Sequence, residues 1–239
     1  MTNTKKQKIL KITAILLAVL TILTAGIIGI CYSVKNNAPT DSTAELQGEP
    51  DFEYSEPKVY NMPKAMQKYF GKVVKKCSDS MGKELSPQEI FGLFEKWYIN
   101  IETPYKLTKY KISSADSDSF DVGSEGVATN MLELEATINF NNHDYVIKGT
   151  GNGPVDAFSN ALMEQDEEEL KPLKNYKFVH YHEHALGEGS NVKGVAYIQI
   201  DAGSAEPYFG VGISENINTA AISALMHAII KSYIKMNVE

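Results

Sequence analysis

Two glycine-rich segments of this chain each lead into a helix built of small residues. The first reads G-T-G-N-G-P-V-D-A-F-S-N-A-L from Gly149 to Leu162, and the second reads G-V-G-I-S-E-N-I-N-T-A-A-I-S-A-L from Gly210 to Leu225. Both combine Gly-x-Gly, a turn and a helix that ends in Ala-Leu. This recurrence predicts two copies of one strand-strand-strand-helix unit, and therefore a duplicated α+β fold.

Hydrophobic patterning supplies the other elements of the two units. In the first unit we expect a strand over 132–140, a turn at 141–144, a returning strand at 145–147, a sheet-breaking glycine turn at 149–153 and a helix over 155–163. In the second we expect strands over 176–186, 192–201 and 207–211, a glycine loop at 210–212 and a helix of about twenty residues. The acidic run 166–169 between the units is expected to be a solvated loop.

Two helices are predicted upstream of the first unit. One begins at Asn61-Met62-Pro63, where Asn61 would cap the helix and proline suits the first turn. The other begins at Ser86-Pro87-Gln88-Glu89, where Ser86 and Glu89 can form a capping box. Two short helices bury little surface alone, so we expect them to pack on a neighbouring part of the protein.

The N-terminal region carries a long uncharged stretch. The 23 residues of 12–34 have no charge, and as a helix they would span about 35 Å, enough to cross a bilayer core of about 30 Å. A cleaved signal peptide is the alternative, but its apolar core is usually shorter. The sequence thus predicts a single-pass membrane protein, with a basic segment at 1–11, a transmembrane helix at 12–34 and a flexible, proline-containing linker at 35–57.

Charge distribution bears on orientation and on partners. Five of the 23 basic residues and none of the 30 acidic ones lie in residues 1–35, so the rest of the chain is acidic. Lysines before the apolar stretch place the N-terminus in the cytoplasm and the folded part outside. The acidic remainder argues against a nucleic-acid partner, because phosphate binding requires a basic surface.

Two groups of residues have a pattern that is compatible with a binding site, one for an anion and one for a metal ion. Residues 149–153 open a helix, where backbone N–H groups and the helix dipole favour an anion, although a plain tight turn explains the same glycines. His180, His182 and His184 alternate on one expected strand and could present imidazoles to zinc, although a polar edge strand has the same pattern. No nucleophile–base motif is visible, so we expect no catalytic residue, no metal and no cofactor.

Three stretches together resemble the C-terminal regulatory, or dimerisation, domain of 2-isopropylmalate synthase. They are Gly149–Ala157, Tyr181–Gly189 (Y-H-E-H-A-L-G-E-G) and Gly210–Ala224, in the order and spacing of that family. Residues 62–81 and 86–98 resemble its helical linker subdomain. The resemblance implies a linker subdomain over 58–103 and a regulatory domain over 104–237. The Arg-Asp-Gly and His-x-His-Asn-Asp motifs of the family's catalytic barrel are absent from these 239 residues, so the chain alone should not condense acetyl-CoA with 2-oxoisovalerate.

The resemblance also implies a ligand. In the family the regulatory domain binds leucine, the end product of the pathway, whereas the similar domain of citramalate synthase senses isoleucine. Carried over by position, the binding residues are Gly151, Asn152, Gly153, Val155, Asp156, Phe178, Tyr181, Ala185, Val192 and Ile217. The family can have alanine at the position of Val192 and is not constant at that of Asp156, which leaves the choice of ligand open.

Several functions are consistent with these features. The first is a regulatory module, a homodimer that binds leucine or isoleucine. The second is a regulatory subunit or remnant that works beside a separate catalytic barrel chain. The third is an interaction domain that has kept the fold without the ligand. The resemblance also conflicts with the charge rule, because the family works in the cytoplasm whereas the lysines place the folded part outside.

Overall fold

The computed structural model describes residues 61–99, 101–114, 131–189 and 192–238. The chain divides into two compact units, Met1–Lys96 with Ile234–Glu239, and Trp97–Tyr233. The segments predicted as a basic N-terminus, a transmembrane helix and a flexible linker lie outside the described residues.

The first unit contains helices α2 (Lys64–Met81) and α3 (Pro87–Phe94). The expected capping box is confirmed: Glu89 N–H donates to Ser86 Oγ at 3.2 Å, and Ser86 N–H donates to the Glu89 carboxylate at 2.9 Å. The expected Asn61 cap is wrong. Helix α2 begins one residue after Pro63, which occupies the capping position and has no side chain able to accept a hydrogen bond.

Apolar side chains hold these two helices together. The buried residues are Met66, Phe70, Cys77, Leu93 and Phe94. The rings of Phe70 and Phe94 meet edge to face with centroids 5.5 Å apart. A π-helical turn, η1 (Glu95–Ile99), follows α3 directly along the chain.

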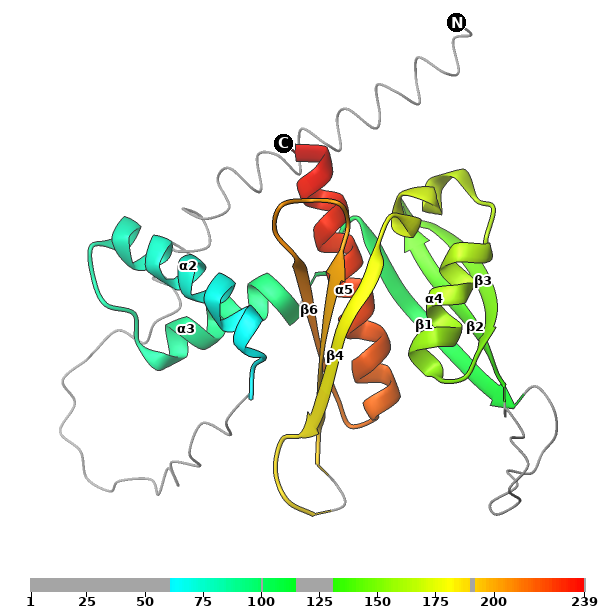
Figure 1. Ribbon diagram of the computed structural model, residues 1–239, viewed down its shortest axis with the longest axis horizontal. Helices are drawn as coiled ribbons and strands as arrows, with labels where there is room; N and C mark the ends of the chain where they lie inside the picture. Colours follow the sequence, from blue (N-terminus) through cyan, green and yellow to red (C-terminus); the bar gives the residue numbers. More distant parts are fainter. Residues whose placement is uncertain (1–60, 100, 115–130, 190–191, 239) are drawn as a thin grey trace, which may run out of the picture. The chain divides into compact units, whose positions relative to one another are not determined.

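The second unit consists of two three-stranded antiparallel sheets, each followed by a helix (Figure 1). The first sheet has the order β1 (Tyr105–Ser114), β2 (Leu132–Phe140), β3 (His143–Gly151), and is followed by α4 (Pro154–Glu164) and the 3₁₀ segment η2 (Glu168–Lys174). The second has the order β4 (Lys177–Ala185), β5 (Gly194–Asp201), β6 (Tyr208–Ser214), and is followed by α5 (Ile217–Val238). The predicted duplicated α+β arrangement is therefore confirmed.

Each helix packs against the last strand of its own sheet through glycine and alanine. A Cβ built on Gly149 would lie 2.6 Å from Ala161 Cα, and one on Gly151 would lie 2.8 Å from Ala157 Cα. In the second half, a Cβ on Gly212 would lie 2.9 Å from Ala224 N and closer still to the Ala220 carbonyl oxygen. Backbones that approach this closely leave no room for a side chain between them.

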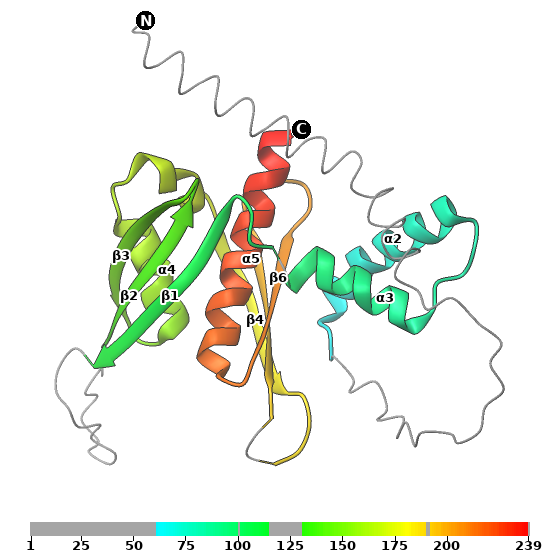
Figure 2. The same ribbon diagram turned by 180° about the vertical axis from the view of Figure 1, so that it is seen from behind.

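Tyrosines join the two halves of this unit. The Tyr110 hydroxyl on β1 lies 2.6 Å from Thr219 Oγ1 on α5. The Tyr176 hydroxyl, just before β4, lies 2.9 Å from Ser159 Oγ on α4. Each helix is thus held by a tyrosine from the opposite half as well as by its own sheet. The two opposed views show α5 beside β1 of the first sheet (Figures 1 and 2).

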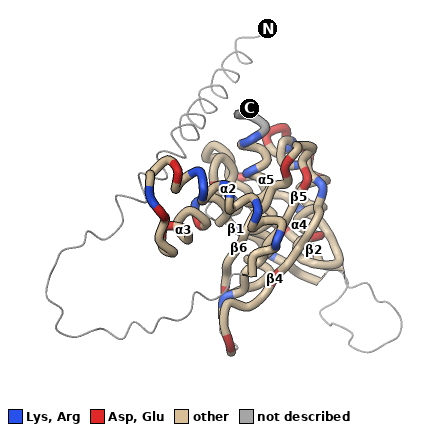
Figure 3. The backbone as a smooth tube through the Cα atoms, turned by 60° about the vertical axis from the view of Figure 1, so that its left-hand side comes forward, with Lys and Arg blue, Asp and Glu red and all other residues tan. Residues whose placement is uncertain are grey.

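The two sheets differ in what their faces bury. Residues 194–198 of β5 are buried without interruption, so this strand is covered on both faces. On β2 and β3, in contrast, Glu135 and Lys148 point outward and form a cross-strand ion pair of 2.8 Å. Figure 3 shows acidic and basic residues interspersed along the described chain. On the outer face of the first sheet, the Glu135–Lys148 pair presents both signs of charge to solvent.

Three local expectations differ from the structure. Gly149, Gly151, Gly210 and Gly212 lie inside β3 and β6, not in loops, because the approach of the helices requires glycine within the strands. The acidic run 166–169 leads into the 3₁₀ segment η2, which buries Leu170 and Leu173. Strand β1 was not identified from the sequence, since its lysines and serines mask the alternation.

The predicted single-pass membrane localisation is corrected. Crossing a bilayer requires a helix of about twenty apolar residues. Among the described residues no helix is both long and apolar enough to do so; α2, for example, is interrupted by lysines throughout. The part of the chain that the structure describes therefore gives no support to the predicted membrane assignment.

Gly212→Ala tests the close packing of helix on strand. The added methyl would collide with the backbone of α5, so we expect the free energy of unfolding to fall by at least about 2 kcal/mol. Urea denaturation monitored by circular dichroism measures the change. Gly153→Ala is the matched control, because a Cβ there meets nothing within 4 Å, and it should cost at most about 1 kcal/mol. Equal losses in both variants would contradict the packing argument.

Candidate functional site

The start of α4 offers a set of backbone N–H groups. Gly153 occupies the capping position in an extended conformation and provides no side-chain cap. The Asp156 carboxylate turns back and accepts a hydrogen bond from the Asn152 N–H at 3.0 Å. Val155 and Asp156 lie in the first turn, where N–H groups have no partner within the helix. The predicted residues at 151–156 are thus gathered around one helix start.

The start of α5 has a different arrangement. Asn216 Oδ1 accepts hydrogen bonds from Asn218 N–H at 2.9 Å and from Thr219 N–H at 3.4 Å. Asn216 N–H in turn donates to Ser214 Oγ at 3.2 Å. A side chain therefore already occupies the position that an anion would take at this helix.

The two helix starts differ in whether a side chain caps them. Both follow a Gly-x-Gly strand, but only α5 is capped by a side chain. The helix dipole and exposed N–H groups favour a carboxylate at the start of α4. The duplicated fold therefore contains one helix start suited to an anion and one that is closed by asparagine.

The apolar members of the predicted site lie on the second sheet and on α5. Ala185 pairs with Gly194 across β4 and β5, and the Ile217 side chain fills the space where Gly194 has no Cβ. Tyr181 is paired with Ile198, which is paired in turn with Gly210. Because directly paired residues share a face, Tyr181 lies on the face that α5 covers.

These apolar side chains are only partly covered. Phe178 is 44% exposed, Tyr181 37% and Ile217 36%, while Val192 is half-buried just before β5. The starts of α4 and α5 and the end of β4 lie at the same end of this unit (Figure 1). The polar start of α4 therefore shares this end of the domain with Ala185 and Ile217, whereas Phe178 lies at the opposite end of β4 and Tyr181 near its middle.

The Tyr181 phenol is a donor at neutral pH. It donates a hydrogen bond to the Glu183 carboxylate two residues along the strand. Burial and this neighbouring carboxylate raise the pKa of Tyr181 above its ordinary value. Tyr181 therefore keeps its proton and offers a ring face and a hydroxyl rather than a charge.

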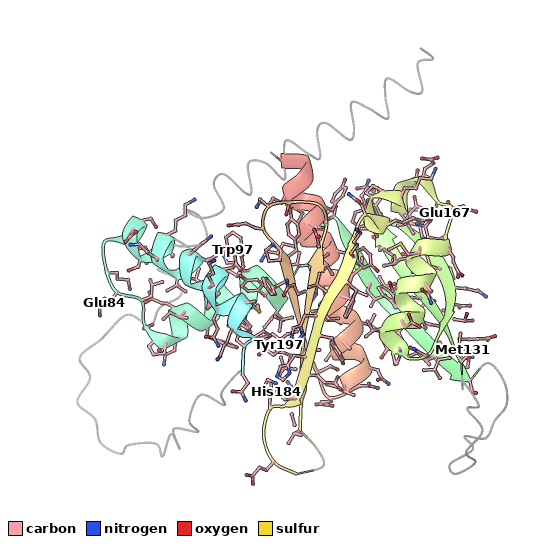
Figure 4. All side chains as sticks on the ribbon, in the orientation of Figure 1. Glu84, Trp97, Met131, Glu167, His184 and Tyr197 are labelled. Atoms are coloured by element: carbon pink, nitrogen blue, oxygen red, sulfur yellow. The ribbon has the colours of Figure 1, made fainter. Side chains whose placement is uncertain are left out.

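The three histidines of β4 do not form a metal centre in the structure. His182 and His184 have ring centroids 5.3 Å apart, and His184 stacks on Tyr197 at 5.9 Å (Figure 4). A register shift separates His180 from Phe178, and His180 bonds to the backbone next to it. Within the described ranges, no group of three His, Cys, Asp or Glu residues could hold a metal ion. The stacked rings act as packing groups.

Sequence reasoning missed the residues that fix this end of the domain. Asn216 and the Tyr110–Thr219 contact were not among the predicted residues, although both lie at the start of α5. Asparagine before a small-residue helix is a capping signal and could have been found. The tyrosine contact joins residues far apart in the chain, and no local pattern indicates it.

Two halves of three strands and a helix, with one helix start that lacks a side-chain cap, define a duplicated α+β domain. The model of the LeuA allosteric (dimerisation) domain matches residues 84–233. The chain belongs to this family, as its glycine segments and closing helix had indicated.

Curated relatives agree with the family assignment. The 2-isopropylmalate synthase of Clostridium acetobutylicum is 44% identical over 174 residues, which cover 73% of this chain and 29% of that enzyme. The synthase of Pseudomonas fluorescens strain SBW25 is 31% identical over 175 residues, covering 72% of this chain and 27% of the enzyme. The synthase of Acetoanaerobium sticklandii is 30% identical over 170 residues. The chain thus spans less than a third of the length of these relatives.

Asn216→Ala tests the role of the α5 cap. Removing the acceptor leaves two N–H groups without their partner, so we expect the free energy of unfolding to fall by about 1 kcal/mol. Chemical denaturation measures this loss. Asn216→Asp should preserve stability, since aspartate caps equally well, and Glu215→Ala at the exposed neighbouring position should change it by less than about 0.5 kcal/mol. An unchanged Asn216→Ala variant would show that the cap contributes nothing.

Proposed function

We propose that this chain is a regulatory domain that binds a branched-chain amino acid, leucine or isoleucine, and that it works as a homodimer. The open start of α4 is the observation that carries this proposal. It lies at the same end as Ala185 of β4 and Ile217 of α5, in a domain of the LeuA allosteric family.

Each part of an amino acid has a chemically suitable counterpart. The α-carboxylate fits the N–H groups at Gly153 and in the first turn of α4. The ammonium group fits the exposed Asp156 carboxylate, which has an oxygen to share beyond its bond to Asn152. The branched side chain fits against Tyr181, Ala185 and Ile217, since apolar atoms gain by leaving water.

The partial exposure of the apolar residues supports a role for a second copy. Phe178, Val179 and Tyr181 on β4 are 44%, 52% and 37% exposed. Strand β4 is the edge of its sheet, and long apolar edges are a liability unless something covers them. A second subunit seated on β4 would cover these side chains and shield the ligand from water.

A second candidate follows from the length comparison. The chain matches 29% of the Clostridium acetobutylicum synthase, so the domain could regulate a catalytic barrel that lies on another chain. Mixing the chain with a barrel-only synthase and assaying condensation of acetyl-CoA with 2-oxoisovalerate tests this arrangement. Inhibition by leucine only when both chains are present would support it, and activity indifferent to this chain would reject it.

Calorimetric titration with leucine and with isoleucine tests the ligand. We expect saturable heat with one of them, and Gly153→Asp should abolish it while keeping the fold. An aspartate there caps α4 and places a negative charge where the ligand's carboxylate would bind. Gly153→Ala adds neither acceptor nor charge and should bind far better than the aspartate variant. Absence of heat at millimolar concentrations of both amino acids would reject the sensor and favour a ligand-free interaction domain.

Val179→Glu tests the proposed dimer surface. A charge in the middle of the apolar edge should be buried without a partner on association, so the dimer should dissociate to monomers. Sedimentation velocity measures the oligomeric state. Val146→Glu is the matched control, since Val146 is equally exposed at 55% but lies on the mixed-charge sheet. A dimer that survives Val179→Glu would place the interface elsewhere.

A further inference from the structure

Helix α5 makes a second set of contacts far from its start. Lys231 Nζ donates a hydrogen bond to the Trp97 carbonyl oxygen at 3.0 Å. The same ammonium group lies 3.6 Å from the Tyr98 ring centroid and 5.2 Å from that of Trp97. One cation thus holds a backbone carbonyl and two aromatic rings, a combination of charge-assisted hydrogen bond and cation–π contact.

The contacted residues are the first of the second unit. The chain passes from one compact unit to the other between Lys96 and Trp97, within the π-helical turn η1. The carbonyl groups at the end of such a turn carry partial negative charge and lack partners in the helix. Lys231 therefore fixes the Trp97–Tyr98 peptide, the first peptide of the second unit, and we call its contacts with Trp97 and Tyr98 the junction latch.

One turn before Lys231, a histidine ties α5 to its sheet. His227 Nδ1 donates to the Val211 carbonyl oxygen on β6 at 2.7 Å, and the ring also hydrogen-bonds the backbone of Tyr98. Between the start of α5 and the latch, the helix backbone at several alanines packs closely against the glycines of β6. The helix is therefore packed along its length, so a shift at one end cannot be absorbed by bending in the middle.

We propose that α5 transmits occupancy of the amino-acid site to the junction latch. The inference rests on the proposed function, since Ile217 at the start of α5 is taken as part of that site. From Ile217 to Lys231 the helix rises by about 21 Å, so the ligand and Trp97 do not touch and any response of Trp97 is indirect. A ligand that displaces Ile217 moves α5 as one body and changes the contacts of Lys231.

The single tryptophan of the chain makes the latch directly observable. The experiment uses the full chain and titrates leucine and isoleucine, recording Trp97 emission and acrylamide quenching beside calorimetry. In the wild type, the amino acid that releases heat should change the emission with the same midpoint as the heat. Lys231→Met should lose the emission response yet still release heat, with an affinity changed by about fivefold or more, because coupling between two sites is reciprocal.

Two control variants keep the test specific. Lys231→Arg retains the cation and should keep the emission response. Lys109→Met removes an exposed lysine of β1 and should behave as the wild type. Circular dichroism checks that each variant is folded.

The outcomes separate the two proposals. Heat of binding without any change at Trp97, or a full emission response in Lys231→Met, overturns the coupling and leaves the amino-acid site standing. No heat with either amino acid rejects the site, and the coupling falls with it.

Discussion

The close contact between glycine strands and alanine helices is the constraint on which the rest of the domain depends. In both halves, backbone atoms of a helix occupy the space that a Cβ on the strand would need. This packing fixes the axis of α4 along β3 and that of α5 along β6. Because the helices cannot drift, the N–H groups at one helix start and the side chains at the other are held in place.

The two halves have the same order of strands and helix, but they differ at their helix starts and on the exposed faces of their sheets. Asn216 closes the start of α5, whereas Gly153 leaves the start of α4 open. One sheet presents paired charges to solvent, and the other leaves Phe178 and Tyr181 uncovered on its edge strand. The proposed function uses both features: the open helix start for charge complementarity, and the uncovered strand for apolar surface. The latch formed by Lys231 extends this asymmetry, since it gives α5 contacts at both of its ends.

Sequence patterns reached some of these features and failed at others for identifiable reasons. The capping box at Ser86 and Glu89 is local, since the residues that form it are three apart, and it was predicted correctly. The predicted Asn61 cap is equally local, but it was wrong. Pro63 occupies the capping position instead, and its ring sets the backbone direction at the first turn. The strand glycines were read as turns, because glycine signals either a turn or a close neighbour, and only the neighbour distinguishes them. Strand β1 was overlooked because its outward lysines outnumber its buried residues.

The sequence by itself determined the duplication, the α+β class and the family, because each depends on the order and spacing of residues along the chain. Only the tertiary structure decided which helix start is open, which side chains of β4 remain exposed, and that Lys231 holds Trp97. These features depend on contacts between residues distant in the chain, such as Tyr110 with Thr219. A local sequence pattern cannot predict such contacts, because they form only when the helices pack against their sheets.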